Sequence, residues 1–147
     1  MRVIEKVVAY VTRGTHLLVF RHVDFHAGVQ VPAGTLEPGE SPHDGVLREA
    51  EEEMGLDGLE VRRFLGVRDY DMSPYGLAEV HRRYYFHLEC KGDAPSIWRH
   101  FESDPSGCPS KRIEFELYWV RLPDEVPELA GCQGDLLGEL DAFPKSG

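Results

Sequence analysis

Residues 34–56 read GTLEPGESPHDGVLREAEEEMGL and follow the spacing G-x5-E-x7-R-E-A-x-E-E-x-G-L. The second half of this stretch is dense in acidic residues, with Glu49, Glu52 and Glu53 close together in the chain. Carboxylate oxygens are the ligands that Mg²⁺ and Mn²⁺ prefer in proteins. The stretch therefore predicts a rigid segment that offers clustered carboxylates to a divalent cation.

Local signals at both ends predict a helix across the second half of the stretch. Ser41 is a favourable N-cap and Pro42 suits the first helical position. Asp44, three residues after Ser41, completes a capping-box pattern. Gly55 is well placed to end the helix in the left-handed conformation. An apolar stripe at helical spacing would face the core, and it consists of Val46, Leu47, Ala50 and Met54.

The acidic residues of the helix have two interpretations. Glu49 lies three and four residues before Glu52 and Glu53, so the three share a face, and like charges at this spacing cost roughly 0.2–0.5 kcal/mol per pair. A bound cation would remove that cost, whereas a solvated Glu-rich face is the usual explanation of a bare REAEEE run. The seven fixed charged and glycine positions would arise together by chance in about one chain of this size per million. The spacing therefore favours the functional interpretation.

With this spacing the chain resembles the Nudix hydrolase family. Residues 34–56 match the signature of this family, the Nudix box, at every charged and glycine position. Ala50 stands where the family more often carries a larger aliphatic residue. The resemblance implies an α/β fold, a Nudix-type α/β/α sandwich with a mixed β-sheet between helices. It also implies that residues 1–147 form a single domain that hydrolyses a nucleoside diphosphate linked to another group, X.

The rest of the chain supplies a compatible order of elements. Runs of β-branched and apolar residues predict strands, and Pro- and Gly-containing links between them predict turns and loops. The segment GDLLGELDAF at 134–143 predicts a final helix, and 92–110 is expected to be irregular. The expected strands are 3–12, 16–20, 29–31, 59–67, 80–88 and 113–122.

Composition narrows the class of protein. The 147 residues suffice for one domain with a real core, and the formal net charge of −10 argues against binding duplex nucleic acid. Three cysteines without metal-ligand spacing, Cys90, Cys108 and Cys132, favour free thiols in a reducing compartment. No continuous apolar run is long enough to cross a bilayer. We therefore expect a cytoplasmic protein without a membrane partner.

The resemblance assigns roles to residues of the box. Mg²⁺ or Mn²⁺ would be the cofactor, and Glu49 or Glu52 would also act as the general base. Arg48 would orient Glu49 or pair with Glu40, and Gly34 and Gly55 would have backbone roles. The expected metal ligands are Glu40, Glu49, Glu52 and Glu53.

Outside the box, residue type alone indicates which side chains could add an acidic group or bind the substrate. Family members often draw one more acidic residue from a loop, and Glu102 in WRHFESD is the first candidate, with a solvent-facing Glu as the alternative. Aromatic rings stack nucleobases and arginines grip phosphate oxygens. Arg82 and Arg83 are adjacent on a predicted strand, so at most one should face the site. The expected substrate-binding residues are Arg21, Arg68, Tyr75 and Trp98.

The sequence as a whole predicts a divalent-metal-dependent pyrophosphohydrolase. Water would attack one phosphorus and release a nucleoside monophosphate and X-phosphate. A non-catalytic nucleotide-sensing or interaction module and an isoprenoid-diphosphate isomerase remain as alternatives, and the intact box disfavours both. The expected partner is a nucleotide or nucleotide-sugar-like small molecule, with a homodimer as a further possibility. The identity of X, the base, the attacked phosphorus and the number of metal ions stay open.

Overall fold

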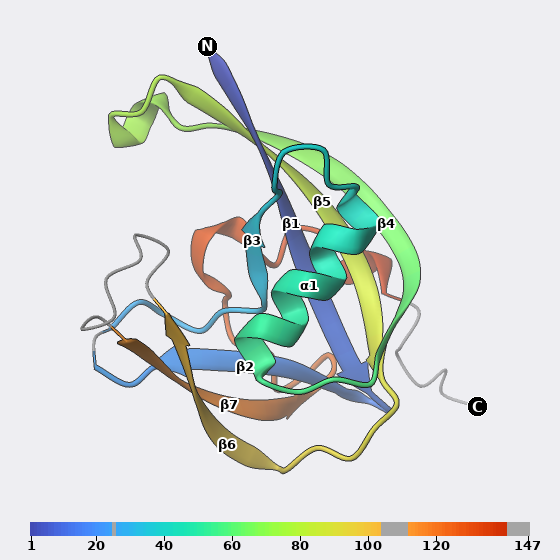
Figure 1. Cartoon of the computed structure of the whole chain (residues 1–147). Helices are drawn as coiled ribbons and strands as arrows, with labels where there is room; N and C mark the ends of the chain where they lie inside the picture. The colour runs from blue at the N-terminus through green and yellow to red at the C-terminus, as the bar shows by residue number, and fades with distance from the viewer. Residues whose placement is uncertain (25, 104–111, 141–147) are drawn as a thin grey trace.

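A seven-stranded mixed sheet and one α-helix, α1 (Pro42–Met54), form the described part of the protein, in a computed structural model (Figure 1). The structure describes residues 1–24, 26–103 and 112–140. The sheet order is β4-β5-β1-β2-β7-β6, with β3 pairing β1. The strands are β1 (Arg2–Arg13), β2 (His16–His22), β3 (Ala33–Thr35), β4 (Leu59–Asp71), β5 (Glu79–Cys90), β6 (Ile97–Ser103) and β7 (Arg112–Arg121). The mixed α/β class is as the sequence predicts.

Strand β1 is the centre of the sheet. It runs parallel to β5 along residues 2–12, and its other side pairs antiparallel with β3 at residues 6–8 and with β2 at its end. Residues 7–12 are all buried. A strand covered on both faces carries a continuous apolar run instead of an alternating one, which explains the sequence VVAYV.

Two apolar layers lie on opposite faces of the sheet. On one face, α1 packs its stripe of Val46, Ala50 and Met54 against β1, β2 and β5. On the other face, the segment after β7 buries Leu129, Leu136 and Leu140 in a second apolar core with Val8 and Tyr10 of β1. The box helix is therefore fixed by a large apolar contact, and its polar face is left for other contacts.

The ends of α1 are where the sequence predicts them. Ser41 Oγ accepts a hydrogen bond from the Asp44 amide at 3.1 Å, and Pro42 occupies the first turn. Gly55 has a φ of 69°, and its amide donates to the Glu51 carbonyl. A Cβ on Gly55 would also lie 2.4 Å from Nδ1 of His100, so both the backbone conformation and the space require glycine here.

Three expectations differ from the structure. Strand β4 extends past 67 to Asp71 and β5 starts at Glu79, so the link between the two expected strands is shorter than predicted, with a 3-10 helix, η1 (Ser73–Tyr75), at its tip. The expected irregular stretch 92–110 contains β6. Residues 29–31 make only isolated bridges, and the strand that leads into the box is β3.

The expected final helix over 134–143 is wrong over its described residues. Two 3-10 helices, η2 (Ala130–Cys132) and η3 (Leu137–Glu139), and turns replace it, and 141–143 lie outside the described residues. Gly134 and Gly138 each disfavour a helix by about 1 kcal/mol, which outweighs the helical spacing of the buried Leu136 and Leu140. Within the described chain, none of the helices has the length and apolarity needed to cross a membrane.

Candidate functional site

The loop between β3 and α1 holds one acidic residue of the box in place. Gly39 adopts a φ of 78°, and the Glu40 amide donates to the Glu37 carbonyl at 3.0 Å, which closes the turn. The Glu40 carboxylate accepts a hydrogen bond from the Glu37 amide at 3.0 Å. The turn therefore fixes both the backbone and the side chain of Glu40 at the start of the helix.

Arg48 joins the carboxylates of the box. Its Nε and Nη2 donate to the two oxygens of Glu40 at 2.7 and 2.8 Å. Its Nη1 donates to Glu49 Oε1 at 2.9 Å and lies 3.4 Å from Glu52 Oε2. Its Nη2 also donates to the Thr35 carbonyl at 3.3 Å. A two-point contact of this kind fixes orientation as well as distance.

The hydrogen bonds between Arg48 and Glu40 shift the pKa values of both residues. The hydrogen bonds from Arg48, and then the one from the Glu37 amide, lower the pKa of Glu40 to about 2. The same hydrogen bonds to Glu40 raise the pKa of Arg48. Both groups are therefore charged across the physiological range.

We expect acid to remove the stabilisation that Glu40 provides. The pKa of Glu40 is lower in the folded chain than its ordinary 4.5, so its contribution is complete above about pH 4.5 and is lost as the pH falls toward about 2. The Tm values of Glu40→Gln and the wild type should differ at pH 7, and the difference should shrink as the pH falls from about 4.5 toward about 2. Glu37→Gln, which changes an exposed carboxylate of the same loop, is the control. If the difference in Tm between Glu40→Gln and the wild type is the same at every pH, the stabilisation does not come from the charge of Glu40.

Glu49 and Glu53 reach from α1 to the strand that precedes it. A Cβ built on Gly34 would lie 2.1 Å from Cδ of Glu49, so the carboxylate occupies space that only glycine leaves open. Glu53 is 6% exposed, and its Oε1 accepts from the Ala33 amide at 3.3 Å. Glu52 is the exposed member of the set, with a side chain that is 52% exposed. The structure thus brings the box carboxylates to one edge, along β3.

Gly34→Ala should displace Glu49 while leaving the fold almost unchanged. The new methyl group would meet the far end of a flexible side chain, and Gly34 does not have a positive φ. Misplacing a catalytic group by about 1 Å can cost about 100-fold in rate, so we expect a loss of that order in kcat with a small change in Tm. Gly138→Ala, where a Cβ meets nothing within 4 Å, is the control. Equal kcat values for the two variants would count against the placement of Glu49.

The residues at this edge fit a divalent cation by chemistry. They are carboxylates, the donors that hard cations select, and a cavity of about 500 Å³ opens beside the loop, lined among others by Thr35, Glu37 and Glu40. Among the residues that the structure describes, no three His, Cys, Asp or Glu side chains converge closely enough to hold an ion. Arg48 lies between Glu40, Glu49 and Glu52. Side-chain rotation of the exposed Glu52 is therefore required before an ion could share these ligands.

The candidates outside the box lie in different places. Glu102 is in β6, opposite Ile113, and not in a loop as expected. Arg21 forms an ion pair with Glu116, its cross-strand neighbour, at 2.7 Å. Trp98 donates from Nε1 to the Met54 carbonyl at 2.8 Å, which satisfies the C-terminal end of α1. These partners of Arg21 and Trp98 thus lie on β7 and at the end of α1, and the side chain of Glu102 lies outside the described part of the structure.

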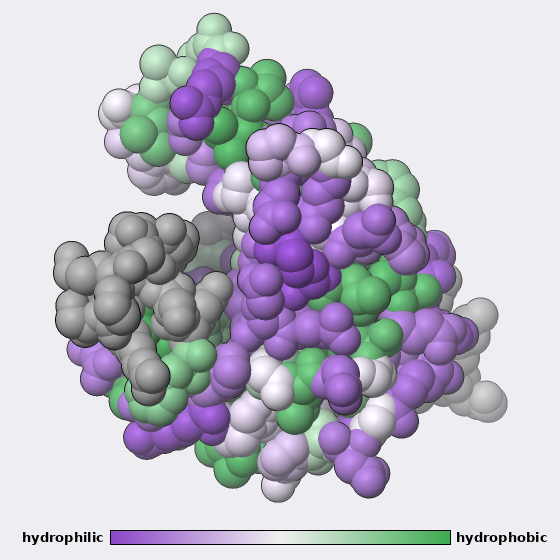
Figure 2. Space-filling view, viewed as in Figure 1, coloured by the Kyte–Doolittle hydropathy of each residue, from purple (hydrophilic) through white to green (hydrophobic). Residues whose placement is uncertain are grey.

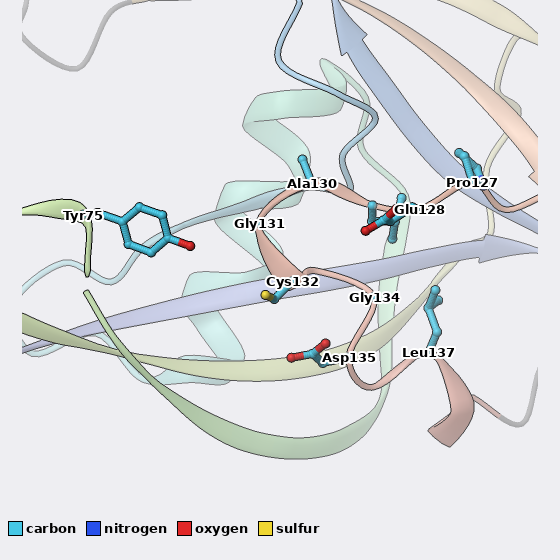
Figure 3. A pocket seen from close by; sticks show the side chains of 10 residues that line it. Tyr75, Pro127, Glu128, Ala130, Gly131, Cys132, Gly134, Asp135 and Leu137 are labelled. Atoms are coloured by element: carbon cyan, nitrogen blue, oxygen red, sulfur yellow. The ribbon is translucent and has the colours of Figure 1, made fainter. Parts of the chain in front are cut away.

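Two other candidates lie on the β4–β5 side of the sheet. Arg68 is exposed on β4, and Tyr75, 74% exposed, is at the tip of the hairpin. Tyr75 lines a cavity of about 660 Å³ whose other wall is the segment 127–137, and its side chain points toward that segment (Figure 3). Of the two adjacent arginines, Arg82 pairs with Asp69 at 2.9 Å, while Arg83 lies over the ring of Tyr70 at 4.3 Å.

Sequence reasoning missed Lys6 next to the box. Its Nζ donates to Thr35 Oγ1 at 3.0 Å, immediately after Gly34. Burial, and then the charge of Arg83, lower the pKa of Lys6, while Glu79 and Glu49 raise it. Only the pairing of β1 with β3 brings Lys6 here, so spacing within the sequence carried no signal for it.

The surface over α1 and β3 is mainly hydrophilic (Figure 2). Together, the mixed sheet, the capped helix and the box on its polar face define a Nudix-type α/β protein. The sequence profile described as NUDIX domain matches residues 4–132, which is most of the chain. The chain belongs to the Nudix hydrolase family, whose members typically use a divalent metal and act on nucleotide-type small molecules.

Comparison with solved structures agrees with this fold. A crystal structure of a UDP-X diphosphatase has a TM-score of 0.64 at 20% identity over 95% of this chain, which spans 61% of that protein. A MutT NUDIX hydrolase from Burkholderia pseudomallei has a TM-score of 0.64 at 22% identity, covering 95% of this chain and 99% of that one. The solution structure of the E. coli ORF135 protein has a TM-score of 0.62 at 21% identity, with coverages of 95% and 89%. A search of curated proteins found no match.

Proposed function

We propose that this protein is a divalent-metal-dependent pyrophosphohydrolase that cleaves a nucleoside diphosphate linked to another group, X. The observation that carries the proposal is the packing of the Glu49 carboxylate against Gly34, in space that any other residue would fill. A helix-mounted carboxylate held against a strand has little freedom, and rigid placement is what a metal site needs.

The roles proposed for the box residues are those of the Nudix family, and the positions of the residues along β3 support them. Glu49, Glu52 and Glu53 would hold Mg²⁺ or Mn²⁺, with Glu40 as a further candidate. A bound ion of this kind polarises phosphoryl oxygens and lowers the pKa of water. Glu49 or Glu52 would accept the proton of the attacking water.

Arg48 and Glu40 are positioning residues in this proposal. Arg48 bonds both Glu40 and Glu49, so it transmits the fixed position of the Glu37–Glu40 turn to a carboxylate on the helix. Partners of this kind keep a ligand carboxylate in one orientation. Glu102 remains a prediction as a further acidic group.

The substrate proposed is a nucleotide or nucleotide-sugar-like small molecule. The name of the UDP-X diphosphatase, a protein of the same fold, supports this class. Cys90 and Cys132 are free thiols, which suits a reducing compartment such as the cytoplasm. We further propose that residues 1–147 act as one domain, and a homodimer remains a prediction.

Chromatographic separation of the products formed from a panel of nucleotides and nucleotide sugars, with Mg²⁺ and with EDTA, tests the proposal. We expect Mg²⁺-dependent release of a nucleoside monophosphate from at least one substrate. Tight nucleotide binding without turnover would favour a sensing module. Conversion of isopentenyl diphosphate without phosphate release would favour an isomerase.

A further inference from the structure

Three cations lie in one row across three neighbouring strands. Arg68 of β4 is opposite Arg83 of β5, and Arg83 is opposite Lys6 of β1. Residues in register on adjacent strands project from the same face of a sheet. Lys6 is in turn opposite Thr35 of β3, so the row ends beside the box.

Cations directly opposite one another on adjacent strands repel each other and destabilise a sheet. The charge of Arg83 lowers the pKa of Lys6, second only to burial. The chain has 16 basic against 26 acidic residues, so such a row does not follow from composition. A negatively charged group bound beside the three cations would reduce their mutual repulsion.

The protein compensates the row only in part. Arg83 donates to the Gly131 carbonyl and lies over Tyr70. Of the acidic groups on this side, Glu79 hydrogen-bonds His81 at 2.8 Å, and Asp135 accepts from Tyr70 at 2.6 Å. The charges of Glu79 and Glu49 favour the protonated form of Lys6 and so raise its pKa, against the effects of burial and Arg83. Within the described residues, Arg68 is exposed and makes no hydrogen bond or ion pair with a carboxylate.

The row connects two features of the molecule. At one end, Lys6 binds Thr35, next to Gly34 and the Glu49 carboxylate. At the middle of the row, Arg83 donates to Gly131, and Tyr70, over whose ring Arg83 lies, donates to Asp135. Gly131 and Asp135 line the cavity of about 660 Å³ that Tyr75 also lines (Figure 3). A ligand lying along the row would thus reach from the carboxylates to this cavity.

We propose that Lys6, Arg83 and Arg68 form a phosphate-binding row that selects nucleotides with three or more consecutive phosphates over those with two. This rests on the proposed function of the box. Adjacent strands are about 4.8 Å apart, so the outer cations are separated by roughly 10 Å at the backbone. One phosphate group contacts one or two cations at that spacing, whereas a chain of phosphoryl groups contacts all three. The cavity beside Arg83 would take the remainder of the substrate.

Calorimetric titration of the full chain with inorganic tripolyphosphate and pyrophosphate, in Mg²⁺ and in EDTA at low salt, tests the row directly. Because a hydrogen bond between charged groups contributes about 1.5–3 kcal/mol, we expect tripolyphosphate to bind the wild type at least about tenfold more tightly than pyrophosphate. Arg68→Gln should remove this difference, and Lys6→Met should weaken both anions. Arg68 is exposed, so its variant should fold.

Arg62→Gln is the matched control, since Arg62 is a half-exposed cation of the same strand that pairs with Glu60 at 3.2 Å. Equal binding of the two anions by the wild type, equal effects of Arg62→Gln and Arg68→Gln, or no binding in either buffer would overturn the proposal. Kinetics separate it from the proposed function. If the wild type hydrolyses a nucleotide but Arg68→Gln leaves the ratio of KM values for triphosphate and diphosphate-sugar substrates unchanged, the row fails while the hydrolase assignment stands. If no substrate is hydrolysed but tripolyphosphate still binds as expected, the hydrolase assignment fails while the phosphate-binding row stands.

Discussion

Glu52→Gln is expected to lower kcat by roughly 10²–10⁴-fold while Tm stays close to that of the wild type. The amide keeps the size of the side chain but removes the negative charge, so it can neither hold a cation well nor accept a proton from water. The fold depends little on this residue, because its side chain is 52% exposed and its hydrogen bonds to Arg48 are long, at 3.4 and 3.5 Å.

Glu51→Gln is the matched control for this experiment. Glu51 is the preceding residue of the same helix and therefore points about 100° away around the helix axis. It should retain full activity, which would show that the loss in Glu52→Gln does not come from changing the charge of the helix. Near-wild-type turnover in Glu52→Gln, with substrate saturating, would refute the role of this carboxylate.

Arg48→Ala is expected to have the second-largest effect, on both stability and activity. Removing Arg48 leaves Glu40 and Glu49 without their shared partner at the edge of β3. After allowance for partial exposure we expect a loss of about 2 kcal/mol in the free energy of unfolding, or about 5 °C in Tm for a chain of this size. Loss of a residue that orients metal ligands typically reduces metal affinity or activity by about 10–100-fold.

Arg82→Ala provides the comparison, because Arg82 makes a two-point contact with the single exposed carboxylate of Asp69, at 2.9 and 3.1 Å. Its Tm should change by about 1 °C. Arg48→Lys should recover part of the stability but not the two-point contact with Glu40. A positioning role further predicts that the Mg²⁺ concentration for half-maximal activity rises in Arg48→Ala. If that concentration is unchanged, Arg48 contributes only to stability.

The helix of the box was predictable because its signals are local. Ser41, Pro42 and Gly55 set its ends through their own conformational preferences, and the structure confirms each. The pairing of Arg48 with Glu40 was also foreseen, since a turn and one helical segment separate them. Local chemistry of this kind does not depend on the rest of the fold.

Features that depend on strand pairing were not predictable. The prolines and polar residues of 92–110 are typical of a loop, so the sequence did not predict β6. Trp98 was expected to bind the substrate, but it donates to a carbonyl at the end of α1. The phosphate-binding row of Lys6, Arg83 and Arg68 exists only through the register of the β4–β5 hairpin and its pairing with β1, which is distant in the sequence. Hydrophobic patterning predicts strands, but it does not state which residues lie opposite each other.

A crystal soaked in Mn²⁺ and measured at the manganese absorption edge tests the central claim most directly, because the anomalous signal locates the ion independently of activity. We predict a peak within about 2.0–2.3 Å of carboxylate oxygens of Glu49, Glu52 or Glu53, with Glu52 turned inward. A peak elsewhere, or none at a concentration that supports catalysis, would contradict the account.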